Sequence, residues 1–112
     1  MMNDPQPWEV WWAEVYFEDH PEEAKRRPVL VLENQTCIVL SLKITSHPPR
    51  MDSFMGEYAL QKWHYAGLTK PSTVRISKLL RLQRSDFVDK VGELHPIDIG
   101  VIERYISMMY HL

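Results

Sequence analysis

The chain has 112 residues, of which 45% are hydrophobic and 25% are charged, and its formal net charge is -2. This composition predicts one folded domain over residues 1–112 and excludes an intrinsically disordered chain. No apolar run approaches the ~20 residues that span a membrane, the first residues do not resemble a signal peptide, and the single cysteine, Cys37, cannot form an internal disulfide. We therefore expect a cytoplasmic protein with no membrane segment.

The charges are unevenly distributed along the chain. Residues 1–24 carry seven acidic side chains and no basic one, residues 25–84 have a net charge of +8, and residues 85–112 have a net charge of -3. A basic middle segment in an otherwise acidic chain is compatible with a site for an anionic substrate. The alternative is that the charges interleave on the folded surface.

Three strands are predicted in the first half of the chain. Residues 8–17 are rich in aromatic and β-branched side chains, and one set of alternate positions predicts the core face: Trp11, Ala13, Val15 and Phe17. The other set is too aromatic for a plain solvent face, so we expect a partner subunit or the N-terminal arm to cover it. Residues 28–32, which begin with a proline, form the second predicted strand.

The third predicted strand, residues 36–45, has the clearest alternation of apolar and polar side chains. The alternation assigns four side chains to the core face and three to the opposite face: Ile38, Leu40, Leu42 and Ile44 against Ser41, Lys43 and Thr45. The chain must then leave the sheet, because two successive prolines cannot donate ladder hydrogen bonds.

The second half of the chain predicts a short strand at residues 57–60, a structured loop at 63–72, a strand at 73–82, and a helical turn or strand end at 86–91. Residues 96–109 predict the one clear helix, with Pro96 in its first turn and Asp98 near the positive end of the helix dipole. Its predicted apolar stripe is Ile97, Val101, Ile102, Tyr105 and Met109. We therefore expect a mainly β fold: a strongly curved antiparallel sheet or open barrel of about five strands, with a C-terminal helix packed against it.

The ends of the second and third strands hold the candidate catalytic groups. Arg27 precedes the Pro-Val strand, and its guanidinium can fork onto a phosphate. Thr45 and Ser46 can donate hydrogen bonds to an anionic oxygen, and His47 can transfer protons near neutral pH. The alternatives are a solvated strand entry for Arg27, ordinary turn chemistry for the hydroxyls, and a surface histidine.

Basic side chains in the middle of the chain are candidates for binding a single nucleic-acid strand, with Trp63 and Tyr65 as stacking partners. A solvated basic face is the alternative. The five histidines show no metal-ligand spacing, and no glycine-rich phosphate loop is present. We therefore expect neither a metal nor a cofactor.

Several segments in order resemble the MazF/PemK toxins of bacterial type II toxin–antitoxin systems. Residues 11–15 and 25–32 resemble the first two strands of that family, and residues 42–47 resemble the end of its third strand. Residues 63–75 are similar to a subset of PemK-like proteins, and residues 91–94 with Asp98 resemble the approach to the last helix. The similarity spans roughly residues 8–106.

This resemblance implies an SH3-like barrel of the CcdB–PemK type with a C-terminal helix, usually a homodimer. It also implies a metal-independent, sequence-specific endoribonuclease that cleaves single-stranded RNA by attack of the 2′-hydroxyl and is inhibited by a cognate acidic antitoxin. Arg27 and Thr45 occupy the positions of the family's catalytic pair. The expected substrate-binding residues are Lys43, Ser46, His47, Arg50, Lys70, Arg75 and Lys78.

Arginine is a poor general base because its pKa lies above ~12, so we assign Arg27 to charge stabilisation and leave proton transfer to His47 as a hypothesis. Two other functions stay open. One is a CcdB-like gyrase-binding toxin, which the tail at residues 106–112 disfavours because it lacks a Trp-Gly-Ile ending. The other is a non-catalytic SH3-like binding module with a peptide groove at Trp8, Trp12 and Tyr16.

Overall fold

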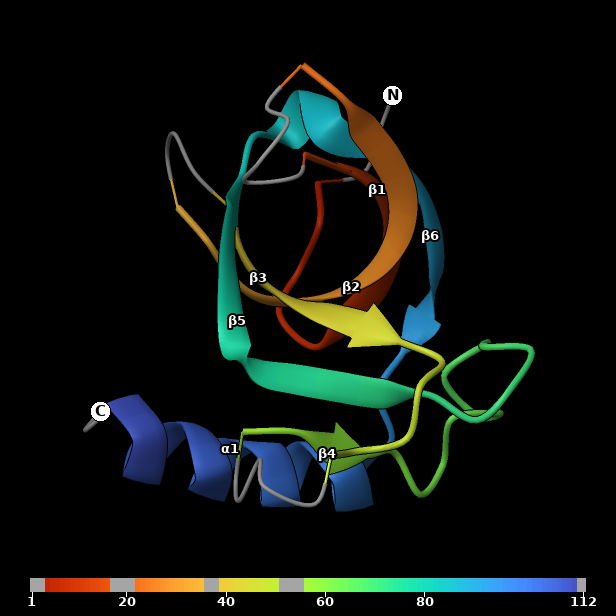
Figure 1. Cartoon of the computed structure of the whole chain (residues 1–112), viewed down its shortest axis with the longest axis vertical. Helices are drawn as coiled ribbons and strands as arrows, with labels where there is room; N and C mark the ends of the chain where they lie inside the picture. Colours follow the sequence, from red (N-terminus) through yellow and green to blue (C-terminus); the bar gives the residue numbers. More distant parts are fainter. Residues whose placement is uncertain (1–3, 17–21, 36–38, 51–55, 111–112) are drawn as a thin grey trace.

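The computed structural model describes residues 4–16, 22–35, 39–50 and 56–110. Within these residues, six strands form one antiparallel sheet in the order β4-β5-β3-β2-β1-β6, with one helix at the C-terminal end (Figure 1). The elements are β1 (Glu9–Tyr16), β2 (Ala24–Asn34), β3 (Val39–Thr45), β4 (Tyr58–Ala59), β5 (Thr73–Leu82), the short 3-10 helix η1 (Arg84–Asp86), β6 (Phe87–Glu93) and α1 (Pro96–Tyr110). The described helix is too short to cross a membrane.

The mainly β fold with a C-terminal helix is confirmed, and β5 has the predicted bounds. The uncertain segment at residues 86–91 is mostly strand β6, which raises the strand number from the expected five to six among the described residues. Strand β2 is longer at both ends than residues 28–32 because it pairs with β1 over Ala24–Leu30 and with β3 as far as Asn34. Phe17, Cys37 and Ile38 lie outside the described residues.

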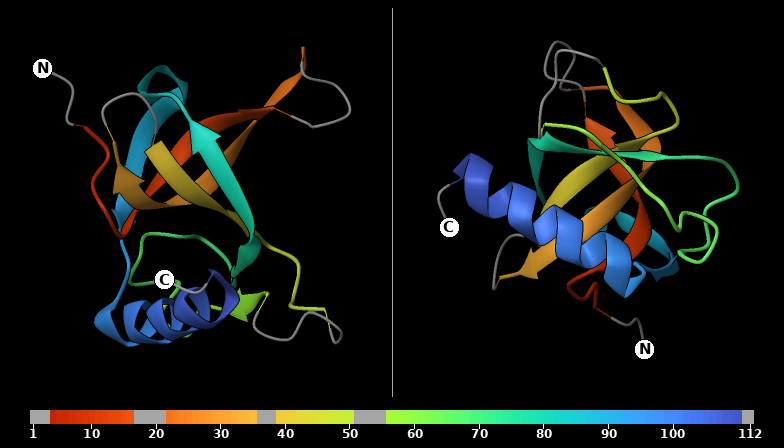
Figure 2. Two further views of the ribbon diagram at one scale, coloured as in Figure 1. Left: turned by 90° about the vertical axis from the view of Figure 1, so that its left-hand side faces the viewer. Right: turned by 90° about the horizontal axis from the view of Figure 1, so that it is seen from below.

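The sheet is apolar on both faces. One face packs against α1 through buried side chains: Val10, Leu30, Leu42, Ile44, Val74 and Ile76 from the sheet, with Ile102 and Ile106 from the helix. The other face curls onto itself and encloses a second core: Trp11, Ala13, Val15, Val29, Val31, Val39, Leu82 and Phe87. Figure 2 shows the helix lying across one side of the curled sheet.

Two expectations are corrected by this double-sided burial. Ser41 was predicted on an open polar face, but it is fully buried because its face lines the second core. On the aromatic face of β1, the chain itself covers two positions. Val10 is buried in the core on the helix side, and Trp8 packs half-buried against that core. Trp12 and Tyr16 on the same face remain 39% and 51% exposed.

Strand β5 bends sharply near its middle (Figure 1). Its pairing with β3 shifts there, because Lys43 lies opposite Arg75 while the neighbouring Leu42 lies opposite Leu79. Residues 76–78 of β5 are therefore extra relative to β3, which is the arrangement of a large β-bulge. The bend allows the first half of β5 to pair with β4 beside α1, while the second half closes the other core.

The predicted apolar stripe of the helix is wrong at its first turn. Ile97 is 47% exposed, whereas Asp98 is fully buried. The Asp98 carboxylate accepts hydrogen bonds from the Tyr58 hydroxyl at 2.6 Å and from the backbone N–H groups of Gln61 and Lys62 at 2.9 Å each. These three donors rotate Asp98 inward, and burial together with the Asp98 hydrogen bond raises the pKa of Tyr58 to about 12.

The loop after β4 lies directly against the backbone of β6. Gly67 has a φ of 90°, and a Cβ built there would be 2.5 Å from the Val91 carbonyl oxygen. A Cβ on Gly92 would be 2.3 Å from the Ala66 carbonyl oxygen. Both glycines are therefore required for this close approach, which holds the loop against β6.

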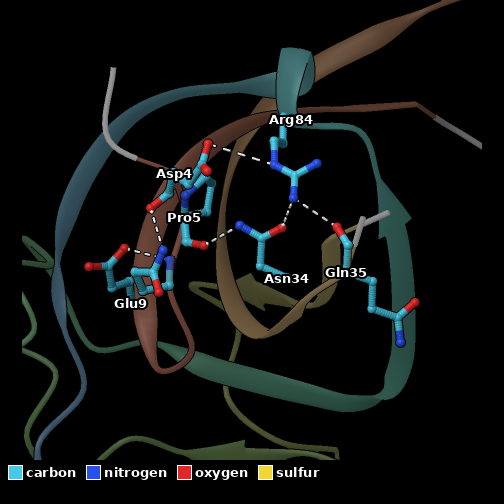
Figure 3. Close-up of polar contacts among 7 residues, drawn as sticks. Asp4, Pro5, Glu9, Asn34, Gln35 and Arg84 are labelled. Carbon is cyan, nitrogen blue, oxygen red and sulfur yellow. Dashed lines mark hydrogen bonds and ion pairs between the residues drawn. The ribbon is translucent and has the colours of Figure 1, made fainter. Parts of the chain in front are cut away.

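The N-terminal arm is held by polar contacts at the end of β2 (Figure 3). The Asn34 side-chain amide donates to the Pro5 carbonyl oxygen at 2.8 Å, and Arg84 donates to the Asn34 side-chain oxygen and to the Gln35 carbonyl oxygen. The Arg84 guanidinium also lies 3.7 Å from the Asp4 carboxylate. Asn34 therefore joins the arm to η1 through both atoms of its amide.

Replacing Gly100 with alanine should stabilise the protein by up to about 1 kcal/mol, because Gly100 is exposed within α1 and an added Cβ meets nothing within 4 Å. Urea-induced unfolding followed by circular dichroism measures the change. The matched control is Gly92→Ala, which should destabilise because of the clash with the Ala66 carbonyl. A Gly100→Ala protein that is less stable than the parent would contradict the expectation.

Candidate functional site

The predicted catalytic groups lie on neighbouring strands: Thr45 is the last residue of β3, and Arg27 lies inside β2. Strands β2 and β3 pair with Val29 opposite Lys43, and continuing this register by two residues sets Arg27 opposite Thr45. Residues two apart on a strand share a face, so the three polar side chains Arg27, Lys43 and Thr45 lie on one face of the sheet. Neighbouring strands are ~4.8 Å apart, which brings the Arg27 guanidinium within reach of the Thr45 hydroxyl.

Strand β5 adds groups on the other side of β3. Thr45 pairs with Thr73, and Lys43 pairs with Arg75. Arg75 therefore stands on the same face as Lys43, and its backbone is separated from β2 by the whole of β3. Two arginines thus flank the end of β3, with Lys43 and Thr45 between them.

These side chains line a cleft of about 520 Å³. Of the nine predicted site residues, the structure brings seven together in its lining: Arg27, Lys43, Thr45, Ser46, His47, Lys70 and Arg75. The loop fixed by Gly67 forms one wall, and Trp12, Arg26 and Pro28 contribute the other side. No acidic side chain of the described residues lines this cleft.

The two remaining predicted residues lie outside the cleft. Arg50 lines an adjoining hollow of about 400 Å³ that shares Thr45, His47 and Arg75 with the cleft. Lys78 lies at the bend of β5 and lines neither space, but its charge is close enough to lower the pKa of Lys43. Lys78 therefore contributes to the potential of the cleft and not to its surface.

The predicted stacking residues are also elsewhere. Trp63 packs partly buried against the helix-side core, and Tyr65 is 64% exposed, with its ring edge-on to His95. The exposed aromatic side chain in the cleft wall is Trp12. The sequence analysis placed Trp12 on the aromatic face of β1 and in the peptide groove of the binding-module alternative. It did not place Trp12 beside the catalytic groups, because the curvature that turns this face toward the cleft is a tertiary property.

Arg26 and Arg27 are neighbours in sequence but differ in their partners. The Arg26 guanidinium donates to a Glu14 carboxylate oxygen at 3.2 and 3.3 Å, on the opposite face from Arg27. Arg27 has no hydrogen bond or ion pair within the part of the chain that the structure describes. Arg26 is therefore engaged in a surface ion pair, whereas the exposed Arg27 keeps its full donor capacity for a ligand or for solvent.

The cleft is strongly positive. Burial lowers the pKa of the half-buried Lys43, and the charges of Arg75, Arg27 and Lys78 lower it further. Four cations around one strand end repel one another, so a bound anion would relieve this repulsion. Phosphate groups are suited to such a site because guanidinium forks bind them in a bidentate manner.

The Thr45 hydroxyl is oriented by the turn that follows it. Its Oγ1 accepts a hydrogen bond from the His47 backbone N–H at 3.3 Å. A hydroxyl that accepts in this way can still donate its own proton. Thr45 can therefore donate to an oxygen of an anion held by Arg27 and Lys43.

Sequence reasoning missed Glu57, whose side chain is 4% exposed at the floor of the adjoining hollow. Its carboxylate accepts from the Arg50 backbone N–H at 2.9 Å and from the Arg75 Nε at 3.1 Å, and it lies 3.4 Å from the Arg50 guanidinium. The Arg50 N–H is the main cause that lowers the pKa of Glu57; burial opposes it, and the charges of Arg50 and Arg75 add to it. Only the pairing of β4 with β5, which the local sequence does not encode, reveals this contact.

The described residues contain no cluster of three or more histidine, cysteine, aspartate or glutamate side chains arranged around a metal position. The groups that the cleft offers are therefore guanidinium, ammonium, hydroxyl and imidazole. This set can bind a phosphodiester, stabilise negative charge that develops on it, and move a proton.

Comparison with known proteins gives a consistent result. Residues 6–110 match the family model of PemK-like, MazF-like toxins of type II toxin–antitoxin systems. The chain is 28% identical to an endoribonuclease MazF6 of Mycobacterium tuberculosis, over 83% of this chain and 90% of the relative.

Solved structures share the fold. A MazF from Deinococcus radiodurans superposes with a TM-score of 0.73 at 19% identity, over 99% of this chain and all (100%) of that one. A mycobacterial endoribonuclease in complex with its cognate antitoxin gives a TM-score of 0.75 at 17% identity, over 96% of both chains. Since the family match covers nearly the whole sequence, this chain belongs to the PemK-like, MazF-like toxins of type II toxin–antitoxin systems.

Proposed function

We propose that this protein is a sequence-specific endoribonuclease that cleaves single-stranded RNA in the cleft between Arg27, Thr45 and the loop at residues 67–70. The observation that carries the proposal is the placement of Arg27, unpaired among the described residues, across from the Thr45 hydroxyl in a cationic cleft. Related proteins named as endoribonucleases support the same activity.

In the proposed reaction, the 2′-oxygen of a ribose attacks the adjacent phosphorus, and the bond from phosphorus to the 5′-oxygen of the next nucleotide breaks. The 2′-hydroxyl loses a proton and the leaving oxygen gains one, which leaves a 2′,3′-cyclic phosphate and a 5′-hydroxyl. Negative charge builds on the non-bridging oxygens in the transition state. Arg27 and Lys43 supply positive charge there, and Thr45 donates a hydrogen bond, so the step requires no metal ion.

Proton transfer needs a different group, because arginine holds its proton at every working pH. His47 lines both the cleft and the adjoining hollow, next to Thr45. We propose it as the group that accepts or delivers a proton in the reaction.

The cellular setting follows from this activity. An RNA-cleaving toxin acts in the cytoplasm and is held in check by an acidic antitoxin, as the antitoxin complexes of related mycobacterial and Deinococcus proteins support. We further propose a homodimer. The peptide-binding alternative loses its separate groove, because Trp12 lines the same cationic cleft as Arg27.

Arg27→Ala should strongly slow the cleavage of a defined RNA pool incubated with the purified protein in EDTA. The parent should leave cyclic-phosphate ends, whereas the variant should be slower by a factor of about 10²–10³, the usual effect of removing one oxyanion donor. Arg104→Ala is the matched control, since Arg104 is an exposed arginine on α1 away from the cleft. Absence of cleavage by the parent, or equal cleavage by Arg27→Ala, would refute the proposed function.

Thr45→Val should slow cleavage by about 10²-fold with little change in RNA affinity, because valine keeps the shape of threonine and removes only the transition-state donor. Thr45→Ser keeps the hydroxyl and should recover most of the rate. Single-turnover cleavage together with binding to a 2′-deoxy analogue separates the two quantities. A Thr45→Val protein with the rate of the parent would exclude a role for the hydroxyl.

His47→Ala should change the pH dependence of single-turnover cleavage, because the variant loses the group proposed to exchange a proton with the substrate. The measurement is the pH–rate profile of the parent and the variant on the same RNA. An unchanged profile would show that His47 takes no part in proton transfer.

A further inference from the structure

The buried Glu57 points to a second anion site beside the cleft. We propose that Glu57 positions the Arg75 guanidinium to bind a second phosphate of the same RNA strand, next to the phosphate held by Arg27 and Thr45. This inference rests on the proposed function, because it takes RNA as the ligand of the cleft.

The strand register places Glu57 directly beside Arg75. Strands β4 and β5 pair with Tyr58 opposite Val74, and continuing by one residue sets Glu57 opposite Arg75. On its other side, Arg75 lies opposite Lys43 of β3. The order across the sheet is therefore Lys43, Arg75, Glu57, with the only acid of this row at the β4 end.

The contact with Glu57 fixes which nitrogens Arg75 can offer. Its Nε donates to a Glu57 carboxylate oxygen at 3.1 Å. A guanidinium has four further N–H donors on its two terminal nitrogens, and among the described residues these make no other hydrogen bond or ion pair. Arg75 thus presents its terminal fork to the space that it lines together with Thr45 and His47.

Glu57 acts through Arg75 because its own carboxylate cannot reach the RNA. Its side chain is 4% exposed, against 20% for Arg75. The Arg50 N–H and the two arginine charges keep it ionised, so it remains a charged anchor at neutral pH. A buried carboxylate of this kind orients a guanidinium without competing for the ligand.

The geometry favours two phosphates over one. Strands β2 and β5 lie on opposite sides of β3, so the backbones of Arg27 and Arg75 are about 10 Å apart. Glu57 draws the Arg75 side chain toward β4 and away from Arg27. Thr45 and His47 lie between the cleft and the adjoining hollow, so an RNA strand passing over them would bring successive phosphates to the two arginines.

The test uses the full chain and a random-sequence, fully 2′-O-methylated single-stranded RNA, which cannot be cleaved. Its affinity is measured by fluorescence anisotropy over a range of salt concentrations. Losing one phosphate contact should lower the slope of log affinity against log salt by about 0.7. Arg75→Gln should weaken binding with this change in slope, and Arg104→Gln should leave affinity and slope close to those of the parent.

The Glu57 variants separate positioning from charge alone. Glu57→Gln removes the charge, while Glu57→Asp keeps it but withdraws the carboxylate from the Arg75 Nε. The proposal predicts that both weaken binding with the change in slope seen for Arg75→Gln, and that Glu57→Gln combined with Arg75→Gln binds no more weakly than Arg75→Gln alone. Additive losses, or Glu57→Asp behaving like the parent, would overturn it.

Two further outcomes keep the test decisive. If the Glu57 variants do not fold in thermal unfolding, the slope of Arg75→Gln alone decides, and an unchanged slope overturns the second phosphate site. If the parent binds RNA with an Arg75-dependent slope but cleaves no RNA, the proposed function fails and the anion site stands. If the parent cleaves RNA but its binding does not depend on Arg75 or Glu57, the proposed function stands and the second anion site is overturned.

Discussion

The pairing of β3 with β2 on one side and β5 on the other is the constraint on which both the core and the site depend. Leu42 is buried against the helix side, while Ser41 is buried on the opposite face. A slip of one residue would exchange these faces and place Leu42 in the cleft instead of Lys43. The burial of apolar side chains thus determines that Thr45 lies between Arg27 and Arg75.

The site is built at the expense of stability. A lysine whose pKa is lowered in the folded state holds its proton less firmly than in the unfolded chain, so protonating Lys43 destabilises the fold. That contribution is unfavourable below the folded pKa of Lys43 and disappears as the pH rises above its ordinary value. Cations that repel one another in this way store free energy that a bound polyanion can release, so the repulsion that lowers the stability of the fold also favours anion binding.

Most of the fold could be predicted because its strands carry clear alternation and its helix a clear start. The strand at residues 73–82 and the helix from Pro96 were found within a residue of their observed ends. The sixth strand was uncertain because residues 86–91 are short and their side chains mix polar and apolar types. The predicted buried face of α1 was wrong at Asp98. The burial of this carboxylate depends on hydrogen-bond donors from residues 58–62, which only the tertiary structure brings near.

The candidate site was predictable where it lies at strand ends and unpredictable where it depends on a distant partner. Arg27, Thr45 and His47 were predicted to lie together because they stand beside regular strands in the sequence, and all three line the cleft. Glu57 was missed because it is one acid in a segment without a pattern, and its role comes from a neighbour 18 positions later. Lys78 was expected in the substrate site, but the bend of β5 moves it out of the cleft lining. The alternation of apolar and polar residues along the strand does not indicate this bend.

The remaining wall of the cleft shows how a loop can serve as a rigid surface. The segment after β4 is anchored at its start by the Asp98 carboxylate, which accepts two successive backbone N–H groups, and in its middle by the contacts of Gly67 and Gly92. The backbone bond from Leu60 to the Ser72 carbonyl closes its base at 2.9 Å. Because the loop is fixed before any ligand binds, Lys70 can contact an anion in the cleft without the entropy cost of ordering a flexible segment. Through Asp98, the C-terminal helix therefore supports this wall of the cleft from behind, although it contributes no side chain to the cleft.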